Sequence, residues 1–191
     1  ISGGNVESSG EMNLNADSDG NGLGNLSIRN GGTVTSNDQT LNISANDVNI
    51  SGALNSGLAA TNIQVSDGGS IGLGLTSGNM SINGAELQNI TASSLNLGGI
   101  NTQLITVDGI TGDQSSNIGS LNLTSSASDG TVNFIKRDST FNSLDVSAGS
   151  NVAVQTNLTT SSGNFTAIAD SDTNGAGGFS LLTGKTISTS G

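Results

Sequence analysis

Residues 40–57, TLNISANDVNISGALNSG, contain the pattern that decides the fold of this chain. Apolar residues occur there in alternating pairs, Leu41 with Ile43 and Val48 with Ile50, and one Asn separates the members of each pair. A period of two places both apolar members on one face of a β-strand and the Asn on the other. The Ser, Asn and Gly residues between the pairs are turn formers. This stretch therefore predicts short strands that are joined by tight turns.

The same pattern continues in both directions along the chain. The further pairs are Met12/Leu14, Leu26/Ile28, Ile63/Val65, Ile71/Leu73, Met80/Ile82, Leu95/Leu97, Ile105/Val107, Leu121/Leu123, Val132/Phe134, Val152/Val154 and Phe179/Leu181. In the densest stretches a pair recurs every ~7–9 residues, so three strands would complete a coil of ~20–25 residues. Coils that stack at about 4.8 Å would number about eight or nine and extend about 40 Å. We therefore predict an all-β fold, a β-solenoid that runs continuously through residues 1–191.

Helical signals are nearly absent from this sequence. The best helical candidate is residues 85–90, and a segment of that length is too short to form a stable helix alone. The glycine pairs at Gly68-Gly69 and at Gly72 and Gly74 lack the Lys and the helix that a phosphate loop uses. We predict that these glycines form corners.

The composition excludes several classes of partner. The 191 residues include 29 Gly but no Pro, Cys, His, Trp or Tyr, and the net charge is −11. Such an acidic chain would be repelled by nucleic acid and by anionic lipid headgroups. No apolar run approaches the ~18 residues of a membrane span. Without Cys the chain can form neither a disulfide scaffold nor a thiolate metal site.

Besides the strand pattern, the sequence contains a longer repeat. Residues 8–36 and residues 161–189 align without a gap at an offset of 153 residues, and 13 of the 29 positions are identical. Apolar positions are kept as Met12/Phe165, Leu26/Phe179, Ile28/Leu181 and Val34/Ile187. We interpret the chain as slightly more than one unit of a tandem array, an excerpt of something longer.

Two acidic turns within this repeat have the oxygen-rich start of a calcium loop. The first contains Asp17, Asp19 and Asn21, and the second contains Asp170, Asp172 and Asn174. Calcium favours such oxygen ligands. An EF-hand would need a bidentate Glu at position 28, where Ile28 stands, so a further ligand would have to come from a neighbouring coil. The alternative interpretation is an acidic turn between coils, with no cofactor.

The sequence also contains eight N-x-[ST] sequons. Their asparagines are Asn25, Asn42, Asn49, Asn79, Asn89, Asn122, Asn157 and Asn164. They would be glycan acceptors if the source and the export route permit glycosylation. The structural alternative is a set of Asn ladders, in which side-chain amides form hydrogen bonds from coil to coil. We expect ladders or plain solvent exposure at most of these positions.

The only basic cluster is Lys136-Arg137-Asp138. We expect it to lie at the top of a turn, where Asp138 would neutralise part of its charge. An alternative is a lateral contact with an acidic neighbour.

Several stretches resemble the filamentous haemagglutinin-like surface proteins. They are residues 40–57, GNMSINGAELQNITASSLNLGG at 78–99, SLNLTSSA at 120–127 and STFNSLDVSA at 139–148. The resemblance covers nearly the whole chain, but its motifs are structural and of low complexity. Members of that family are giant secreted adhesins whose shafts are right-handed parallel β-helices. The resemblance therefore implies a right-handed parallel β-helix in an extracellular or cell-surface fibre, and it supplies no catalytic residues.

Four function classes follow from these observations. The first is a structural or adhesive shaft, not an enzyme, whose partners are neighbouring repeats and a surface glycan or host receptor. The second is a polysaccharide-active β-helix enzyme, which the scattered basic residues, the three glutamates and the absence of His disfavour. The third is a calcium- or glycan-binding module of an adhesin. The fourth is a disordered linker, which the regular apolar pairs disfavour.

Overall fold

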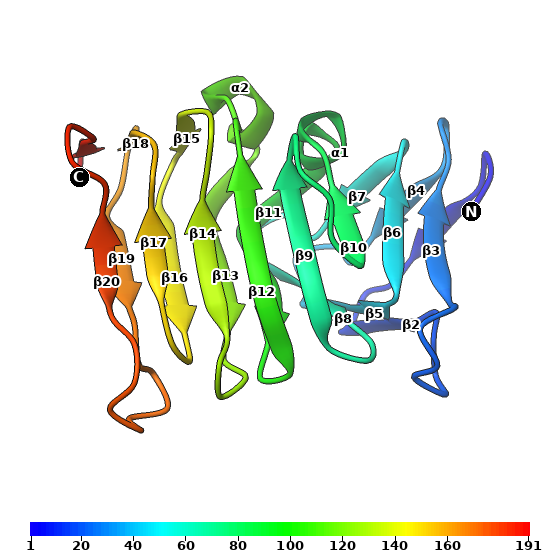
Figure 1. The fold of residues 1–191 in the computed structure, drawn as a ribbon. Helices are drawn as coiled ribbons and strands as arrows, with labels where there is room; N and C mark the ends of the chain where they lie inside the picture. The colour runs from blue at the N-terminus through cyan, green and yellow to red at the C-terminus, as the bar shows by residue number, and fades with distance from the viewer.

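A computed structural model describes residues 1–191 of the protein. The chain forms 21 strands and two short helices, and every strand pair is parallel. Strands that follow one another along the chain lie in different rows, except β9 (Gly69–Gly74) and β10 (Met80–Ile82), so most parallel neighbours are distant in sequence (Figure 1). The predictions of an all-β fold and of parallel sheets are confirmed.

The strands form three rows. Row one contains β2 (Met12–Asn15), β5 (Leu41–Ala45), β8 (Ala60–Val65), β11 (Ile90–Gly99), β13 (Ile118–Ser125), β16 (Leu144–Ala148) and β19 (Phe165–Ile168). Row two contains β3 (Asn25–Ile28), β6 (Asp47–Ile50), β10 (Met80–Ile82), β9 (Gly69–Gly74), β12 (Thr102–Asp108), β14 (Thr131–Phe134), β17 (Val152–Val154) and β20 (Phe179–Leu181). Row three begins with β1 (Asn5–Glu7), β4 (Thr33–Thr35) and β7 (Ala53–Asn55) and ends with β15 (Ser139–Phe141), β18 (Leu158–Thr160) and β21 (Ile187–Thr189). Backbone pairing is continuous only along row one, because no pairing joins β6 to β10 in row two and no strand pairing joins β7 to β15 in row three.

A segment that contributes one strand to row one, at least one strand to row two, and either a strand or a short helix to row three is called a layer here. Hydrogen-bonded asparagines in row one are 20 to 34 residues apart along the chain, a wider range than the expected ~20–25 residues. The longest spacing occurs where the chain adds β10 and a helix between β8 and β11. Row one consequently has seven strands, which is fewer than the eight or nine coils that the pattern predicted.

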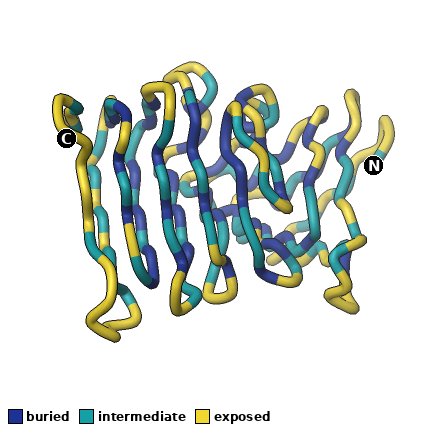
Figure 2. Tube along the Cα trace, in the orientation of Figure 1, coloured by how far each residue is buried: buried dark blue, intermediate teal, exposed yellow.

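The core lies between the rows. All the alternating apolar pairs predicted from the sequence fall inside strands, and their side chains belong to one cluster of 34 buried residues or pack against it, except in the last layer. Strand β5 shows the alternation most clearly, because Leu41, Ile43 and Ala45 are buried while the residues between them are half-buried. Figure 2 shows the resulting alternation of buried and less buried positions along the tube. Burying each large aliphatic side chain contributes roughly 1.5–3 kcal/mol.

Two helical turns interrupt row three between β7 and β15. Helix α1 (Gly84–Gln88) overlaps the predicted segment, and Asn83 and Glu86 form a capping box at its start. Helix α2 (Gly112–Ser115) was not predicted, and it packs on α1 and on β15. Neither helix has the length and apolar character that crossing a membrane requires.

The two termini lie at opposite ends of the rows (Figure 1). The last layer has a neighbour on one side only, because β19, β20 and β21 end their rows. Phe179 and Leu181 of β20 are therefore 46% and 41% exposed, whereas Val152 and Val154 of the preceding β17 are buried. The structure thus exposes apolar side chains and unpaired strand edges at its C-terminal end.

Candidate functional site

An asparagine ladder runs along the outer face of row one. Five asparagines occupy the same register position on successive strands, and each Nδ2 donates to the Oδ1 of the residue in the preceding strand. They are Asn13, Asn42, Asn62, Asn96 and Asn122, joined by hydrogen bonds of 2.8, 2.6, 2.5 and 2.5 Å. A chain of amides that each donate and accept once is mutually polarising. The ladder therefore couples five strands through their side chains as well as through their backbones.

The ladder stops at Asp145. In register, Asp145 of β16 stands beside Asn122, but an ionised carboxylate has no proton to donate to the Asn122 Oδ1. The hydroxyl of Ser120 lies there instead, 3.2 Å from the Asn122 Oδ1 and 3.4 Å from an Asp145 carboxylate oxygen. The charged residue thus sets the C-terminal limit of the ladder.

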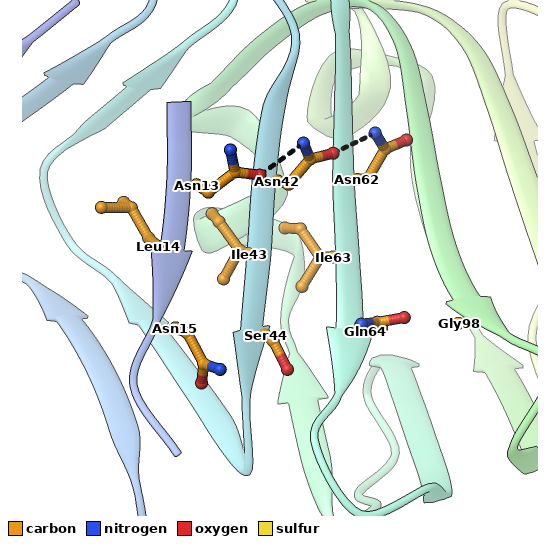
Figure 3. Close-up of a pocket in the computed structure, with 10 residues that line it drawn as sticks. All are labelled: Asn13, Leu14, Asn15, Asn42, Ile43, Ser44, Asn62, Ile63, Gln64 and Gly98. Atoms are coloured by element: carbon orange, nitrogen blue, oxygen red, sulfur yellow. Dashed lines mark hydrogen bonds between the residues drawn. The ribbon is translucent and has the colours of Figure 1, made fainter. Parts of the chain in front are cut away.

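A groove of about 340 Å³ lies beside the ladder, across β2, β5 and β8 (Figure 3). It is lined by Asn13, Leu14, Asn15, Asn42, Ile43, Ser44, Asn62, Ile63, Gln64 and Gly98. One edge is the ladder, in which the Nδ2 groups of Asn42 and Asn62 are already paired. The other edge presents the Asn15 Nδ2, the Ser44 hydroxyl and the Gln64 amide, none of which donates a side-chain hydrogen bond within the chain. This edge can offer donors and acceptors to a ligand rich in hydroxyl groups.

The first acidic turn folds as a closed set of hydrogen bonds. One carboxylate oxygen of Asp17 accepts from the Gly22 N–H at 2.9 Å and from the Ser66 hydroxyl at 2.5 Å. The Asn21 side chain donates to Asp19 at 2.7 Å and accepts from the Leu23 N–H at 3.0 Å. The Ser66 hydroxyl, together with the Gly22 N–H, lowers the pKa of Asp17 below its usual 3.8.

The second acidic turn repeats this geometry. Asp170 accepts from the Gly175 N–H at 3.2 Å, and Asn174 donates to Asp172 at 2.8 Å and accepts from the Ala176 N–H at 2.7 Å. Left-handed backbone positions also coincide, since Gly20 and Gly22 have φ of 61° and 76° where Thr173 and Gly175 have 57° and 81°. The two copies of the repeat therefore share these hydrogen bonds and two left-handed positions. They differ at Asp170 and Gly177, which have a positive φ where Asp17 and Gly24 do not.

The oxygens proposed for calcium are engaged within these turns. Asp17, Asp19 and Asn21 lie together, and so do Asp170, Asp172 and Asn174, but at least one side-chain oxygen of each accepts a hydrogen bond within its turn. Calcium takes six to eight oxygens, and no group of three or more acidic residues in the structure is placed to hold a metal ion. The geometry favours the interpretation as an acidic turn, and calcium binding stays a prediction.

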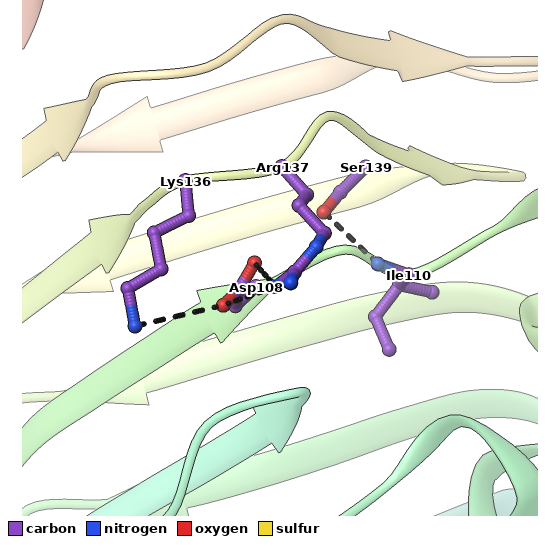
Figure 4. Close-up of polar contacts among 5 residues, drawn as sticks. All are labelled: Asp108, Ile110, Lys136, Arg137 and Ser139. Atoms are coloured by element: carbon purple, nitrogen blue, oxygen red, sulfur yellow. Dashed lines mark hydrogen bonds and ion pairs between the residues drawn. The ribbon is translucent and has the colours of Figure 1, made fainter.

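An ion pair between a buried carboxylate and an exposed guanidinium links two layers of row two (Figure 4). Asp108 at the end of β12 has a fully buried side chain, and its two carboxylate oxygens lie 3.1 and 3.3 Å from the Arg137 guanidinium. Lys136, which has a positive φ of 57°, places its Nζ 4.0 Å from the same carboxylate. Beside this pair, the Ile110 N–H donates to the Ser139 hydroxyl at 3.2 Å.

The prediction that Asp138 neutralises part of the charge of Lys136 and Arg137 was wrong. The cluster does lie in a turn, but Asp108 from the preceding layer neutralises its charge, whereas Asp138 accepts two hydrogen bonds of 2.9 Å from Asn157. Local sequence pattern could not identify Arg137 as the partner of Asp108, because the two residues are 29 apart along the chain. The available signal was a single Asp directly after an alternating apolar strand.

The eight sequons fall into two groups. The Nδ2 of Asn42, Asn89, Asn122 and Asn157 donates a hydrogen bond to a neighbouring layer, so a glycan on that nitrogen would break the contact. Asn25, Asn49, Asn79 and Asn164 are exposed, and no hydrogen bond from their Nδ2 is formed within the chain. The ladder alternative is confirmed at Asn42 and Asn122, and any glycans are predicted on the exposed group.

Comparisons with known proteins do not identify this chain. No protein family matches it, and neither a curated protein sequence nor a solved structure matches it. Its function therefore has to be inferred from its sequence and from the arrangement of its residues.

Proposed function

We propose that this chain is a shaft segment of a large extracellular repetitive protein, with a structural or adhesive role. In this proposal the three rows are the faces of a right-handed parallel β-solenoid, and layers add along one axis to extend a surface fibre. The observation that carries the proposal is the duplicated layer. Residues 8–36 and 161–189 share strand positions, turn hydrogen bonds and some left-handed backbone positions, such as Gly22 and Gly175, at an offset of 153 residues.

The length of the particle tests this proposal. A shaft grows in proportion to the number of its layers. We would image the present chain and a version in which residues 8–160 occur twice in tandem by electron microscopy. The expected result is a rod whose length roughly doubles at constant width. Fibre diffraction should show an axial spacing of about 4.8 Å. A compact particle that grows in all dimensions would reject the shaft.

The proposal includes no catalytic role. Cleavage of a polysaccharide would need carboxylates and basic groups that are free to act on a substrate. In this chain the closest approach of such groups, Asp108 with Arg137, is a paired contact whose carboxylate is fully buried. Incubation of the protein with acidic and neutral polysaccharides should release no sugar, and any turnover would contradict this part of the proposal.

The extracellular location is part of the same proposal. It is supported by the resemblance to secreted adhesins and by the four sequons that lie exposed on the outer surface. Antibodies raised against the folded chain should label intact, unpermeabilised cells of the source organism or their secreted fibres. Labelling only after permeabilisation would contradict the location.

The groove beside the ladder supports a second candidate function, glycan binding. The edge away from the ladder combines an amide from Asn15, a hydroxyl from Ser44 and an amide from Gln64. Such groups can donate hydrogen bonds to, and accept them from, a ligand rich in hydroxyl groups. Titration with a panel of oligosaccharides should perturb the NMR signals of β2, β5 and β8. Combined substitution N15A and Q64A should abolish the effect, whereas N133A on row two should not. No perturbation by any glycan would reject this function.

A further inference from the structure

The exposed C-terminal edge has a counterpart in the same molecule that is covered. In the repeat, Leu26 and Ile28 of β3 stand where Phe179 and Leu181 of β20 stand. Strand β6 lies beside β3 in the structure, and Ile28 is completely buried, whereas Leu181 is 41% exposed. The difference in exposure follows from the neighbouring strand that β3 has and β20 lacks.

One short segment supplies all the neighbours of the counterpart layer. Strand β5 pairs with β2, β6 pairs with β3 and β7 pairs with β4, and these three strands all come from residues 41–55. The registers place Leu41 beside Met12, Val48 beside Leu26 and Leu54 beside Val34. This segment therefore fits the three edges of such a layer at once.

The last residues of the chain, 189–191, correspond to the turn that precedes this segment in the counterpart layer. At the offset of 153, Ser190 and Gly191 correspond to Asn37 and Asp38, whose φ values are 50° and 60°. Glycine adopts a positive φ without strain, so Gly191 suits the position of Asp38. Thr189 supplies a hydroxyl at the position of Ser36, whose hydroxyl donates to the Gln39 carbonyl at 2.5 Å. The turn that begins the covering layer can thus form here.

We propose that the edge of β19, β20 and β21 binds a segment with the sequence pattern of residues 39–57, in parallel and in the registers of the counterpart layer. Phe165 would then lie beside a residue like Leu41, Phe179 beside one like Val48, and Ile187 beside one like Leu54. The inference rests on the proposed function, because it names the repeat segment that continues the shaft. It also gives the register in which that segment pairs with β19, β20 and β21.

A grafted extension tests the inference. Residues 39–57 are appended directly after Gly191, which preserves the offset of 153 residues. The matched control carries the same segment with L41N, I43N, V48N and I50N, so that its length and turns are unchanged. With the unaltered segment, amide exchange in β19 and β20 should slow by about tenfold or more relative to the control. The melting temperature should rise by about 2–4 °C or more.

Strand β13 serves as an internal reference for these measurements. Slower exchange at β19 and β20 with the unaltered segment alone supports the proposed joint. Equal exchange in the two versions, while β13 stays protected, overturns the inference and leaves the shaft intact. Rapid exchange in β13 as well would overturn the stacked fold, and the proposed function with it.

Discussion

At the scale of single residues, the buried carboxylate of Asp108 has one main partner, the Arg137 guanidinium. The Asp108 side chain is fully buried, and the Arg137 Nη1 is 3.1 Å away. R137A would leave the carboxylate without its main partner. We expect the free energy of unfolding to fall by about 1–3 kcal/mol, because an unsatisfied buried group retains its desolvation cost. Urea denaturation measures this change.

Lys136 provides the control for that experiment. Its Nζ is 4.0 Å from the same carboxylate, and its side chain is 67% exposed. Exposed ion pairs contribute little to stability, so K136A should have a much smaller effect than R137A. Equal effects of the two substitutions would show that the guanidinium has no special role.

Asp138 makes stability depend on pH. Hydrogen bonds from the side-chain amide and the backbone N–H of Asn157, with the charge of Lys185, lower its pKa below the usual 3.8. A depressed pKa in the folded state stabilises the fold above the unfolded pKa, and this contribution is lost as the pH falls through the folded value. D138N should therefore reduce the loss of melting temperature between about pH 4 and pH 2.

The comparison for this pH series is D129N. Asp129 lies exposed in a turn and its carboxylate makes no hydrogen bond in the structure. A series of melting curves should show the same acid-dependent decline for D129N as for the unaltered chain. A flattened decline in both variants would mean that general charge, and not the Asn157 contact, controls the acid response.

At the scale of strands, the ladder should be sensitive to the loss of one donor. In N96D the carboxylate can still accept from Asn122, but it cannot donate to the Asn62 Oδ1. We expect a loss of about 1–3 kcal/mol in the free energy of unfolding. N133D adds the same charge in β14, where the Asn side chain makes no hydrogen bond, and it should cost much less. Similar losses would exclude a contribution from the ladder.

The bend in β11 at Gly98 should tolerate no side chain. Gly98 has a φ of 86°, and a Cβ there would collide with the Thr124 carbonyl oxygen of β13. G98A should therefore destabilise the fold by more than about 1 kcal/mol. At the adjacent Gly99 a Cβ would meet only the Gln64 Oε1, at 3.5 Å, so G99A is the control. Thermal melting of both variants checks the prediction, and equal stability of the two would contradict it.

The alternation of apolar residues was enough to predict most strands of rows one and two, but no strand of row three contains a predicted pair. Leu41 with Ile43 and Val132 with Phe134 lie in strands because a period of two buries one face. Pairing between distant segments could not be predicted in the same way. Met80 and Ile82 form a strand as expected, but β10 inserts beside β9 of its own layer. Helix α2 depends on a capping box at Thr111 and Gln114, which has no apolar periodicity.

The candidate sites were predictable only in part. The oxygen-rich turns were visible as Asp17 and Asp170, yet the sequence could not show that the Ser66 hydroxyl from a later layer reaches Asp17. The sequons pointed to Asn42 and Asn122, but a ladder also needs Asn62 and Asn96 in register, and that depends on the fold. Contacts between layers are set by pairing partners that local pattern does not specify.

At the scale of the whole molecule, acidity should oppose association of the open ends. The net charge is −11, and like charges repel over a distance that salt shortens from about 30 Å at 0.01 M to about 8 Å at 0.15 M. Raising the salt concentration should therefore increase end-to-end association through the exposed apolar edge. Sedimentation velocity at both salt concentrations measures it. The chain that carries the extension with L41N, I43N, V48N and I50N should associate to the same extent as the unextended chain. A decrease in association at the higher salt concentration would contradict the prediction.

The parallel stacking has a mechanical consequence. Near the C-terminal end, each layer is joined to the next by one short strand pair in each row, and these bonds point along the direction in which the rows extend. A force that pulls the two termini apart would load the outermost layer first, because the interior layers are held from both sides. The molecule should then yield by peeling from its ends in small successive steps, and a long fibre of this kind would lengthen under tension before it broke.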